Sequence, residues 1–295
     1  MTGPDYAKQG YTDVTAVLED AVLTITINPA QHRPKEFAGA LYKNLLHVFE
    51  LCDRDDRVRA VILTADPTAP AYCSGGDISG GWDSLWDAES EKEGEHAHRD
   101  AGGILAMAIY RCRKITIAAV NGNAAGIGMT ALQLPFDFRF VWKDAKLVFP
   151  FVRRGIVPEA TSTYLLPLLI GHARAAALLL TARVASPRSS PALAALYHDV
   201  LPTRDAVYPA ARAFALELVG RQRRGDAESP RAGVGVQEEK EGEGEECEAY
   251  GRAKALLQHP GRSLEESYLL EEDLGGPNPS PWWRRIDIRH RKSKL

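Results

Sequence analysis

An α/β protein with a largely parallel sheet is the fold class that the sequence predicts, on three observations. Two nearly unbroken apolar runs, Val58 to Thr64 and Ile115 to Val120, are typical of strands covered on both faces. Between them, apolar residues recur at helical spacing from Ala101 to Arg111. A turn of small residues follows each run. Strands that alternate with helices in this way favour a parallel sheet flanked by helices.

Composition excludes several classes of protein. The chain has 295 residues, 45% of them hydrophobic and 25% charged, with a formal net charge of −3, so nothing indicates a nucleic-acid partner. No apolar run approaches the roughly 18 residues of a membrane span, and the N-terminus lacks the apolar stretch of a secretory signal. The four cysteines are far apart, which predicts neither a disulfide framework nor a zinc site and favours a reducing compartment.

The chain is expected to have four parts. Residues 1–13 are polar and contain Gly3, Pro4 and Gly10, which predicts a loose leader. Residues 14–220 form the core domain. Residues 221–248 are rich in Gly, Arg and Glu and are predicted to be a disordered insertion, because such a segment cannot bury enough apolar surface to offset its ordering entropy. Residues 249–295 form a C-terminal helical segment and tail.

Within the core domain, residues 14–27 are expected to form a hairpin around Glu19-Asp20. A helix should follow with Leu41, Leu45, Val48 and Phe49 on one face. The helix from Ala101 should turn Ile104, Leu105, Ala108 and Ile109 inward. Further expected elements are a short helix with Met129, Leu132 and Leu134, a strand from Phe138 to Trp142, a helix with Tyr164, Leu165, Leu168 and Leu169 that ends at Gly171, a helix from Ala173 to Leu180, and one with Val207, Ala211, Phe214 and Leu218 on one face.

Two glycine-rich turns, residues 71–78 and residues 121–128, are the features around which the chain is organised. Glycine lets the backbone approach a ligand closely and adopt φ values that other residues avoid. A helix that begins directly after such a turn leaves N–H groups pointing outward. Two turns from separate parts of the chain could therefore direct two N–H donors at one oxygen, the geometry that stabilises a developing oxyanion.

These turns carry a family resemblance. Tyr-Cys-Ser-Gly-Gly-Asp-Ile and Asn-Gly-Asn-Ala-Ala-Gly-Ile-Gly resemble the two signature segments of the crotonase (enoyl-CoA hydratase/isomerase) superfamily, and the resemblance runs from about Val14 to Leu218. It implies a spiral of repeated β-β-α units with a C-terminal helical region. It also implies that the amides of Ser74 and Ile127 hold the thioester oxygen of an acyl-CoA. The substrate-binding residues that it implies are Ser74, Gly75, Gly76, Asp77, Ile78, Gly126 and Ile127.

Glu159 is the candidate base. It follows Pro158 before an apolar helix, and its position resembles that of the catalytic glutamate in peroxisomal Δ3,Δ2-enoyl-CoA isomerases. The alternative is an acid that merely favours the first turn of a helix, with Pro158 at its first position. A helix N-terminus lowers the pKa of a carboxylate and an apolar pocket raises it, so the sequence leaves the sign open. Thr130 and Phe151 stand where hydratases of the superfamily carry two glutamates, which disfavours simple hydration.

The resemblance therefore implies an isomerase that moves the double bond of a 3-enoyl-CoA to the 2-position in fatty acid β-oxidation. No metal or separate cofactor is expected, since coenzyme A is part of the substrate. Two alternatives stay open. One is a hydratase or dehydratase of a peroxisomal secondary-metabolite pathway; the other is a protein that binds acyl-CoA without turnover.

The chain ends in Ser293-Lys294-Leu295 behind a basic run, which matches the tripeptide read by the peroxisomal import receptor. We therefore expect a peroxisomal location, with a solvated basic tail as the alternative. The resemblance also implies a homotrimer or hexamer.

Overall fold

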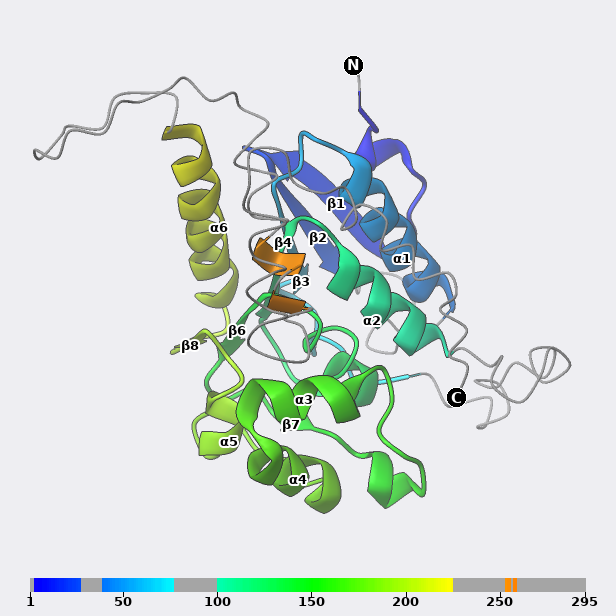
Figure 1. Ribbon diagram of the computed structural model, residues 1–295, viewed down its shortest axis with the longest axis vertical. Helices are drawn as coiled ribbons and strands as arrows, with labels where there is room; N and C mark the ends of the chain where they lie inside the picture. Colours follow the sequence, from blue (N-terminus) through cyan, green and yellow to red (C-terminus); the bar gives the residue numbers. More distant parts are fainter. Residues whose placement is uncertain (1–2, 28–38, 77–99, 225–252, 256, 259–295) are drawn as a thin grey trace, which may run out of the picture. The chain divides into compact units, whose positions relative to one another are not determined.

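The computed structural model of the chain describes residues 3–27, 39–76, 100–224, 253–255 and 257–258 (Figure 1). The chain divides into two compact units, Met1–Arg221 and Gln222–Leu295. Of the second unit, the described residues are the end of helix α6 and the helical residues 253–255 and 257–258. Among the described residues, no helix combines the length and the apolar character needed to cross a membrane.

The first unit is built on a six-stranded sheet with the order β1-β2-β3-β4-β6-β8. Its strands are β1 (Val14–Glu19), β2 (Val22–Ile27), β3 (Ala60–Ala65), β4 (Ile115–Val120), β6 (Phe138–Trp142) and β8 (Asp199–Leu201). The β1–β2 pair is antiparallel and every other pair is parallel. A second small sheet pairs β5 (Ala124–Ala125) with β7 (Leu147–Val148). The predicted α/β class is confirmed.

The expected hairpin is present, with Glu19 opposite Val22 and Val14 opposite Ile27. Its two turn residues, Asp20 and Ala21, have φ values of 52° and 62°. Positive φ at both central residues is typical of the type I′ turn, whose twist matches that of the flanking strands.

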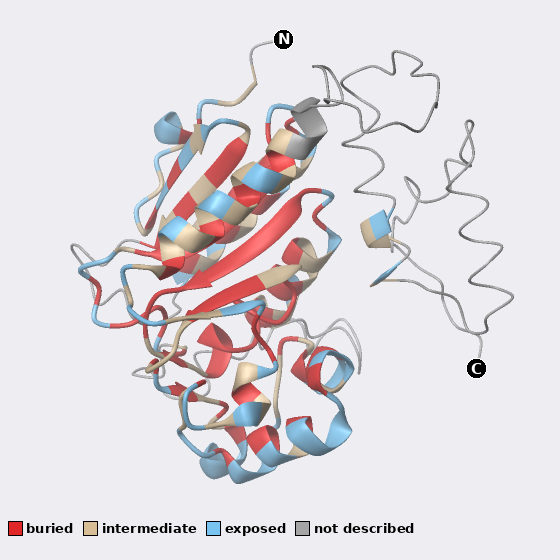
Figure 2. Cartoon of the chain, turned by 90° about the vertical axis from the view of Figure 1, so that its left-hand side faces the viewer, coloured by how far each residue is buried: buried red, intermediate tan, exposed pale blue. Residues whose placement is uncertain are grey.

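Helices α1 (Gly39–Arg54) and α2 (Ala101–Arg111) connect the parallel strands and pack side by side (Figure 1). The predicted inward face of α1 is confirmed, with Cys52 added to it. In α2 the buried residues are Gly102, Leu105, Ala106 and Ile109, whereas Ile104 is 38% exposed, so its predicted inward position is wrong. Nearly every residue of α2 is apolar, so residue type does not distinguish its buried face from its exposed face. Figure 2 shows buried and exposed residues side by side on the same helices.

The remaining elements of the first unit form a helical layer and an edge helix. They are η5 (Phe151–Arg154), α3 (Ser162–Ile170), α4 (His172–Thr181), α5 (Pro191–Ala194) and α6 (Val207–Arg224). Gly171 ends α3 with a φ of 83°, as predicted. No short helix spans residues 129–134; a 3-10 turn, η4 (Gly126–Gly128), is followed by further turns. Helix α6 continues through residues 221–224, which the composition of the sequence places in the insertion; residues 225–248 lie outside the described part.

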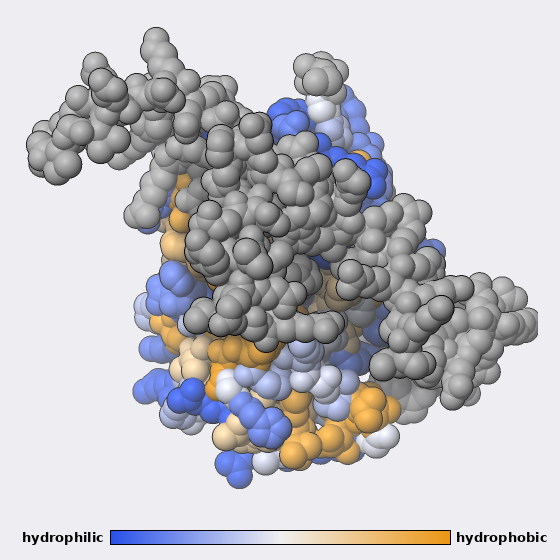
Figure 3. Space-filling model, in the orientation of Figure 1, coloured by the Kyte–Doolittle hydropathy of each residue, from blue (hydrophilic) through white to orange (hydrophobic). Residues whose placement is uncertain are grey.

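Apolar side chains gather on the surface of the helical layer, toward the lower part of Figure 3. The most exposed of them are Val157 (80%), Leu180 (70%), Leu168 (67%) and Tyr164 (63%). Tyr164 and Leu168 thus face outward, although we expected them on the apolar face of their helix. Exposed apolar patches of this kind mark interaction surfaces. The homotrimer or hexamer stays a prediction.

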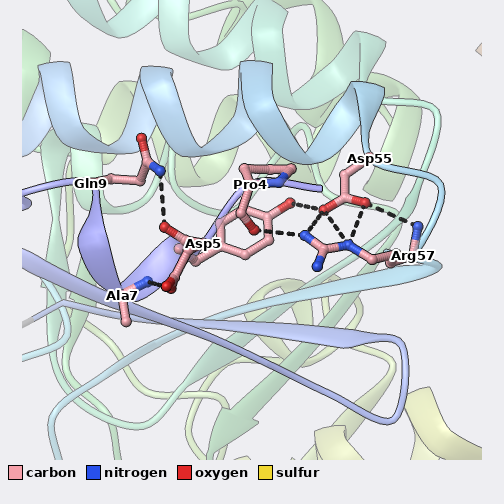
Figure 4. A network of polar contacts seen from close by, with 7 residues as sticks. Pro4, Asp5, Ala7, Gln9, Asp55 and Arg57 are labelled. Carbon is pink, nitrogen blue, oxygen red and sulfur yellow. Dashed lines mark hydrogen bonds and ion pairs between the residues drawn. The ribbon is translucent and has the colours of Figure 1, made fainter. Parts of the chain in front are cut away.

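The N-terminal residues are tied to the core, which corrects the prediction of a loose leader for residues 3–13. Tyr6 is buried, and its hydroxyl donates a 2.9 Å hydrogen bond to the buried carboxylate of Asp55 (Figure 4). Arg57 donates to the same carboxylate at 2.7 Å and to the carbonyl of Pro4 at 2.6 Å. Burial alone raises the pKa of Asp55, but the hydrogen bonds from Arg57 and Tyr6 outweigh it, and the pKa lies below its usual range.

Substituting Tyr6 with Phe should lower the free energy of unfolding by about 1–2 kcal/mol, because a buried carboxylate loses a donor. Since the pKa of Asp55 is depressed, its contribution is complete above the unfolded value near pH ~4 and is lost as the pH falls through the folded value. Urea unfolding at pH 7 and pH 3 measures both effects. Tyr11→Phe is the matched control, because the Tyr11 hydroxyl contacts His47 at the surface. Equal losses in both variants would contradict the anchoring role.

Candidate active site

The two glycine-rich turns lie against each other and exchange backbone hydrogen bonds. The N–H of Tyr72 donates to the carbonyl of Asn123 at 2.9 Å, and the N–H of Ala125 donates to the carbonyl of Cys73 at 3.0 Å. Cys73 and Ala124 form a parallel bridge. The turns follow β3 and β4, which are neighbours in the sheet, so the carboxyl ends of two parallel strands deliver them to the same edge.

Glycine is required in the second turn because the backbones approach so closely. A Cβ atom on Gly128 would lie 2.4 Å from the carbonyl oxygen of Cys73, and one on Gly122 would lie 2.8 Å from the nitrogen of Tyr72. Gly75 and Gly126 have φ values of 114° and 54°, which L side chains rarely adopt. All four glycines therefore serve the contact between the turns.

The predicted oxyanion donors sit on these two turns. Ile127 lies in the first turn of η4, where its N–H has no carbonyl of its own helix to donate to. Ser74 is exposed on the other turn, directly before Gly75, and a Cβ atom on Gly126 would lie 3.8 Å from the Cα of Gly75. The structure thus brings together the turns that carry Ser74, Gly75, Gly76, Gly126 and Ile127. Asp77 and Ile78 lie outside the described residues, and the oxyanion role stays a prediction.

Buried polar side chains hold the turns in place, and sequence reasoning missed them. The Asn121 side chain bonds both the N–H and the carbonyl of Ala65, at 3.2 Å and 2.6 Å, and so joins the ends of β3 and β4. Gln133 donates to the carbonyl of Gly128 at 2.7 Å and accepts a 2.7 Å bond from the Tyr197 hydroxyl. These contacts join residues from distant parts of the chain, so no local pattern marks them.

The backbone that follows Glu159 is strained. Ala160 and Thr161 have φ values of 53° and 63°, in the left-handed region, which is unfavourable for a β-branched residue such as Thr161. Ser162, the first residue of α3, donates to the carbonyl of Glu159 from both its N–H (3.1 Å) and its hydroxyl (2.7 Å). Strain of this kind persists where the surrounding structure fixes a residue, and it concentrates at functional sites.

Glu159 is half-buried, and its environment makes it a stronger base than an ordinary glutamate. Burial raises its pKa to about 7, and the negative charge of Asp100 adds to the rise. The pKa of Glu159 is therefore shifted upward, a direction that the sequence alone leaves open. Helix α3 begins at Ser162, so Pro158 is not its first residue and Glu159 lies before the helix, where the dipole acts more weakly.

Asp100 is the functional candidate that sequence reasoning missed. Its side chain caps α2 and accepts a 2.7 Å bond from the N–H of Gly103. An acidic residue directly before an apolar helix is a recognisable cap. Its proximity to Glu159, by contrast, depends on tertiary structure.

Three further residues near the turns lack the chemistry of a base or a nucleophile. Thr130 and Phe151 are both buried, and neither carries a carboxylate. Burial raises the pKa of the Cys73 thiol to about 11, against a smaller lowering effect of the Gly75 N–H, so the thiol is protonated at neutral pH. Glu159 and Asp100 are therefore the carboxylates that the described part of this site offers.

A cavity of about 550 Å³ lies elsewhere, between the sheet and the start of α6. Its polar lining includes Thr24, Thr64, Asn121, Arg204 and Tyr208. Asn121, the first residue of the second turn, lines this cavity, whereas Ser74, Ile127 and Glu159 do not, so the part of the turns that carries the predicted oxyanion donors is the candidate active site.

Substituting Gly128 with Ala should separate the two turns, because the added methyl group meets backbone atoms that cannot move aside. We expect the free energy of unfolding to fall by about 1–3 kcal/mol and turnover to fall about a hundredfold, as the oxyanion donors move apart. Gly220→Ala in α6 is the control, since no described atom lies within 4 Å of the added methyl. A folded Gly128→Ala variant with full turnover would contradict the role of the close approach.

Substituting Thr161 with Gly should relieve backbone strain and raise the free energy of unfolding by up to about 1 kcal/mol. Turnover should fall about tenfold, because Glu159 is then held less firmly. Thr163→Gly, an exposed position inside α3, should instead lower stability by about 0.3–0.5 kcal/mol. Urea unfolding and steady-state rates measure both effects. Loss of stability at both positions would show that residue 161 carries no strain.

Comparisons with known proteins agree with this geometry. The profile of the enoyl-CoA hydratase/isomerase family matches residues 18–224. A protein of Alternaria alternata called enoyl-CoA hydratase AFT3-1 is 36% identical over 199 residues, which are 68% of this chain and 64% of that protein. Mouse peroxisomal enoyl-CoA delta isomerase 3 is 28% identical over 189 residues, 64% of this chain and 57% of that protein. The match thus spans less than two thirds of the length of these curated relatives, 64% of the first and 57% of the second.

Solved structures show the same architecture. A probable enoyl-CoA hydratase/isomerase from Mycobacterium abscessus superimposes with a TM-score of 0.66 at 28% identity, covering 89% of this chain and 88% of that one. The expected crotonase fold is therefore confirmed. On the matched residues, the paired turns and the fold, the chain belongs to the enoyl-CoA hydratase/isomerase family.

Proposed function

We propose that this family member is an isomerase that shifts the double bond of a 3-enoyl-CoA to the 2-position, in the β-oxidation of unsaturated acyl chains. The observation that carries the proposal is Glu159, a half-buried carboxylate whose pKa is raised to about 7 by burial and by Asp100. A base with a pKa close to the working pH both accepts and returns a proton efficiently.

In the proposed reaction, the Glu159 carboxylate removes a proton from C2 of the 3-enoyl thioester. The electrons of the C2–H bond form the C1=C2 bond of a dienolate that still contains the C3=C4 bond, and the π electrons of the carbonyl move to the thioester oxygen, which takes up negative charge. The amides of Ser74 and Ile127 stabilise that charge. The protonated Glu159 then delivers the same proton to C4, the carbonyl re-forms, and a 2-enoyl-CoA results. On protonation at C4 the C3=C4 electrons bind the proton and the C1=C2 electrons become the new C2=C3 bond. Atoms and charge balance without a metal or a further cofactor.

The site chemistry around Glu159 supports a single base. Thr130 and Phe151 cannot activate water as carboxylates do, and Phe151 contributes an apolar ring to the core. A proton that moves between two carbons of one substrate needs no water. Isomerisation thus needs Glu159 as its one proton-transferring side chain, together with the two backbone amides.

Hydration of a 2-enoyl-CoA is the second candidate, and two observations favour it. Asp100 supplies a second carboxylate whose charge acts on Glu159. In addition, the similar proteins of Alternaria alternata are called enoyl-CoA hydratases. Two carboxylates can hold and deprotonate a water molecule, and a hydratase or dehydratase of a secondary-metabolite pathway would use the same pair. A non-catalytic acyl-CoA-binding protein is the third possibility, which the test below also addresses.

The test offers the purified protein a 3-enoyl-CoA and, separately, a 2-enoyl-CoA, while the ultraviolet absorbance of the conjugated thioester is followed. We expect the absorbance to rise with the first substrate and to stay constant with the second. Glu159→Gln should lose at least about a hundredfold in rate, as expected for loss of a general base. Glu217→Gln, an exposed position in α6, is the matched control.

The dependence on pH adds an independent check. Because the carboxylate form is the base, kcat/KM should rise through a midpoint near pH 7 and level off above it. Falling absorbance with the 2-enoyl-CoA, and no change with the 3-enoyl-CoA, would replace the isomerase assignment by hydration. Binding of both substrates without any change would leave the fold and overturn both enzymatic proposals. The peroxisomal tripeptide lies outside the described residues, and import stays a prediction.

A further inference from the structure

The peptide group between Gly126 and Ile127 carries one of the two predicted oxyanion donors, and its oxygen is held by hydrogen bonds. The carbonyl of Gly126 accepts the N–H of Met129 at 2.8 Å and the N–H of Thr130 at 3.1 Å. This peptide is trans, so its carbonyl and its N–H point in opposite directions. The donors at Gly126 therefore fix the direction of the Ile127 N–H, which points away from Met129 and Thr130.

A chain of hydrogen bonds leads from this peptide to a buried tyrosine. The N–H of Met129 belongs to the peptide group whose oxygen is the carbonyl of Gly128, and that carbonyl accepts a side-chain N–H of Gln133 at 2.7 Å. Oε1 of the same Gln133 side chain accepts the hydroxyl of Tyr197 at 2.7 Å. From Tyr197 to Ile127, each amide group thus accepts one hydrogen bond at its oxygen and donates the next from its nitrogen. We call this chain the Tyr197 relay.

The relay lies in the core of the protein. Met129 and Gln133 are fully buried, and Tyr197 is 8% exposed. Successive hydrogen bonds between aligned amide groups polarise one another, and they do so more strongly where water is excluded. Each N–H along the relay is therefore a better donor than the same group would be alone, and the last of them is the N–H of Ile127.

Arg139 holds the two side chains at the head of the relay in place. Its Nε donates to the carbonyl of Leu196, directly before Tyr197, at 2.9 Å. Its Nη1 donates to the carbonyl of Phe136 and, at 3.4 Å, to the backbone carbonyl of Gln133. Burial raises the pKa of Tyr197 far above its ordinary value, against a smaller lowering effect of Arg139. The tyrosine hydroxyl thus keeps the proton that it donates to Gln133.

We propose that Tyr197 and Gln133 are positioning residues, which orient and polarise the Ile127 amide through the relay. Both side chains act through the backbone of the second glycine-rich turn. Because the relay strengthens a donor to the thioester oxygen, its effect is greatest in the transition state, where that oxygen gains charge. The inference rests on the proposed function, in which the Ile127 amide stabilises the dienolate, and it adds the groups that prepare this amide.

Tyr197→Phe removes the hydroxyl at the head of the relay and leaves the ring. We expect kcat to fall about three- to tenfold with little change in KM, less than the roughly hundredfold or greater loss that follows deletion of an oxyanion donor. Tyr6→Phe is the matched control, because it also removes a buried hydroxyl with a hydrogen bond, 2.9 Å long, to Asp55. Both variants should lose stability, but Tyr6→Phe should keep its kcat.

Gln133→Met breaks the relay next to the turn, because methionine has no N–H to offer the carbonyl of Gly128. We expect kcat to fall about tenfold. In this background Tyr197→Phe should have no further effect on kcat, since the hydroxyl then has no relay to polarise. Losses that multiply in the double variant would show two independent packing effects and overturn the inference.

The amide proton of Ile127 in ligand-free protein gives a readout besides activity. Selective labelling of isoleucine with ¹⁵N makes the signal visible by NMR, and Ile127→Val identifies it. Weaker polarisation should move this proton to higher field in Tyr197→Phe and in Gln133→Met but not in Tyr6→Phe. That result supports the relay even if no enoyl-CoA is turned over and the proposed function fails. An unmoved signal in both folded variants overturns the inference, even if the wild type isomerises a 3-enoyl-CoA.

Discussion

The close approach of two backbone turns is the constraint on which the rest of this structure depends. Gly128 brings the second turn to within van der Waals contact of Cys73, and Gly122 does the same at Tyr72. Parallel strands end at the same edge of a sheet, and β3 and β4 are neighbours, so their order brings the two turns close together. Helix α2 then packs on Ile127 through a third glycine, Gly102. The two turns contact each other through backbone atoms, and glycine is the residue type that allows so close an approach.

The candidate site also includes two carboxylates, those of Asp100 and Glu159. Asp100 is the N-cap of α2, and its carboxylate accepts the N–H of Gly103. Glu159 is half-buried, and burial raises its pKa to about 7. The strained residues Ala160 and Thr161 keep Glu159 in that environment, and the two bonds from Ser162 oppose relaxation of the strain.

Much of this arrangement could be predicted from the sequence. Apolar runs predicted strands β3 and β4, and the alternation of residues along 22–27 predicted the hairpin. The small residues that follow β3 and β4 predicted the two turns. Prediction failed where local pattern is ambiguous: α2 is apolar all round, so Ile104 was placed inward and lies outward. It failed also where tertiary contacts decide. The pKa of Glu159 depends on its burial and on the charge of Asp100, which lies 59 positions earlier in the chain, and no local pattern records either effect.

The bond between Tyr6 and Asp55 joins residues 49 positions apart and makes the start of the chain part of the core. Proteolytic cleavage after Gly10 would therefore remove Tyr6 and its hydrogen bond to Asp55 from the core. Asp55 would keep Arg57 but lose the phenol that covers it, water would reach the carboxylate, and the end of α1 would lose its neighbour. Loss of residues 1–10 would therefore remove a contact of the core as well as the start of the chain.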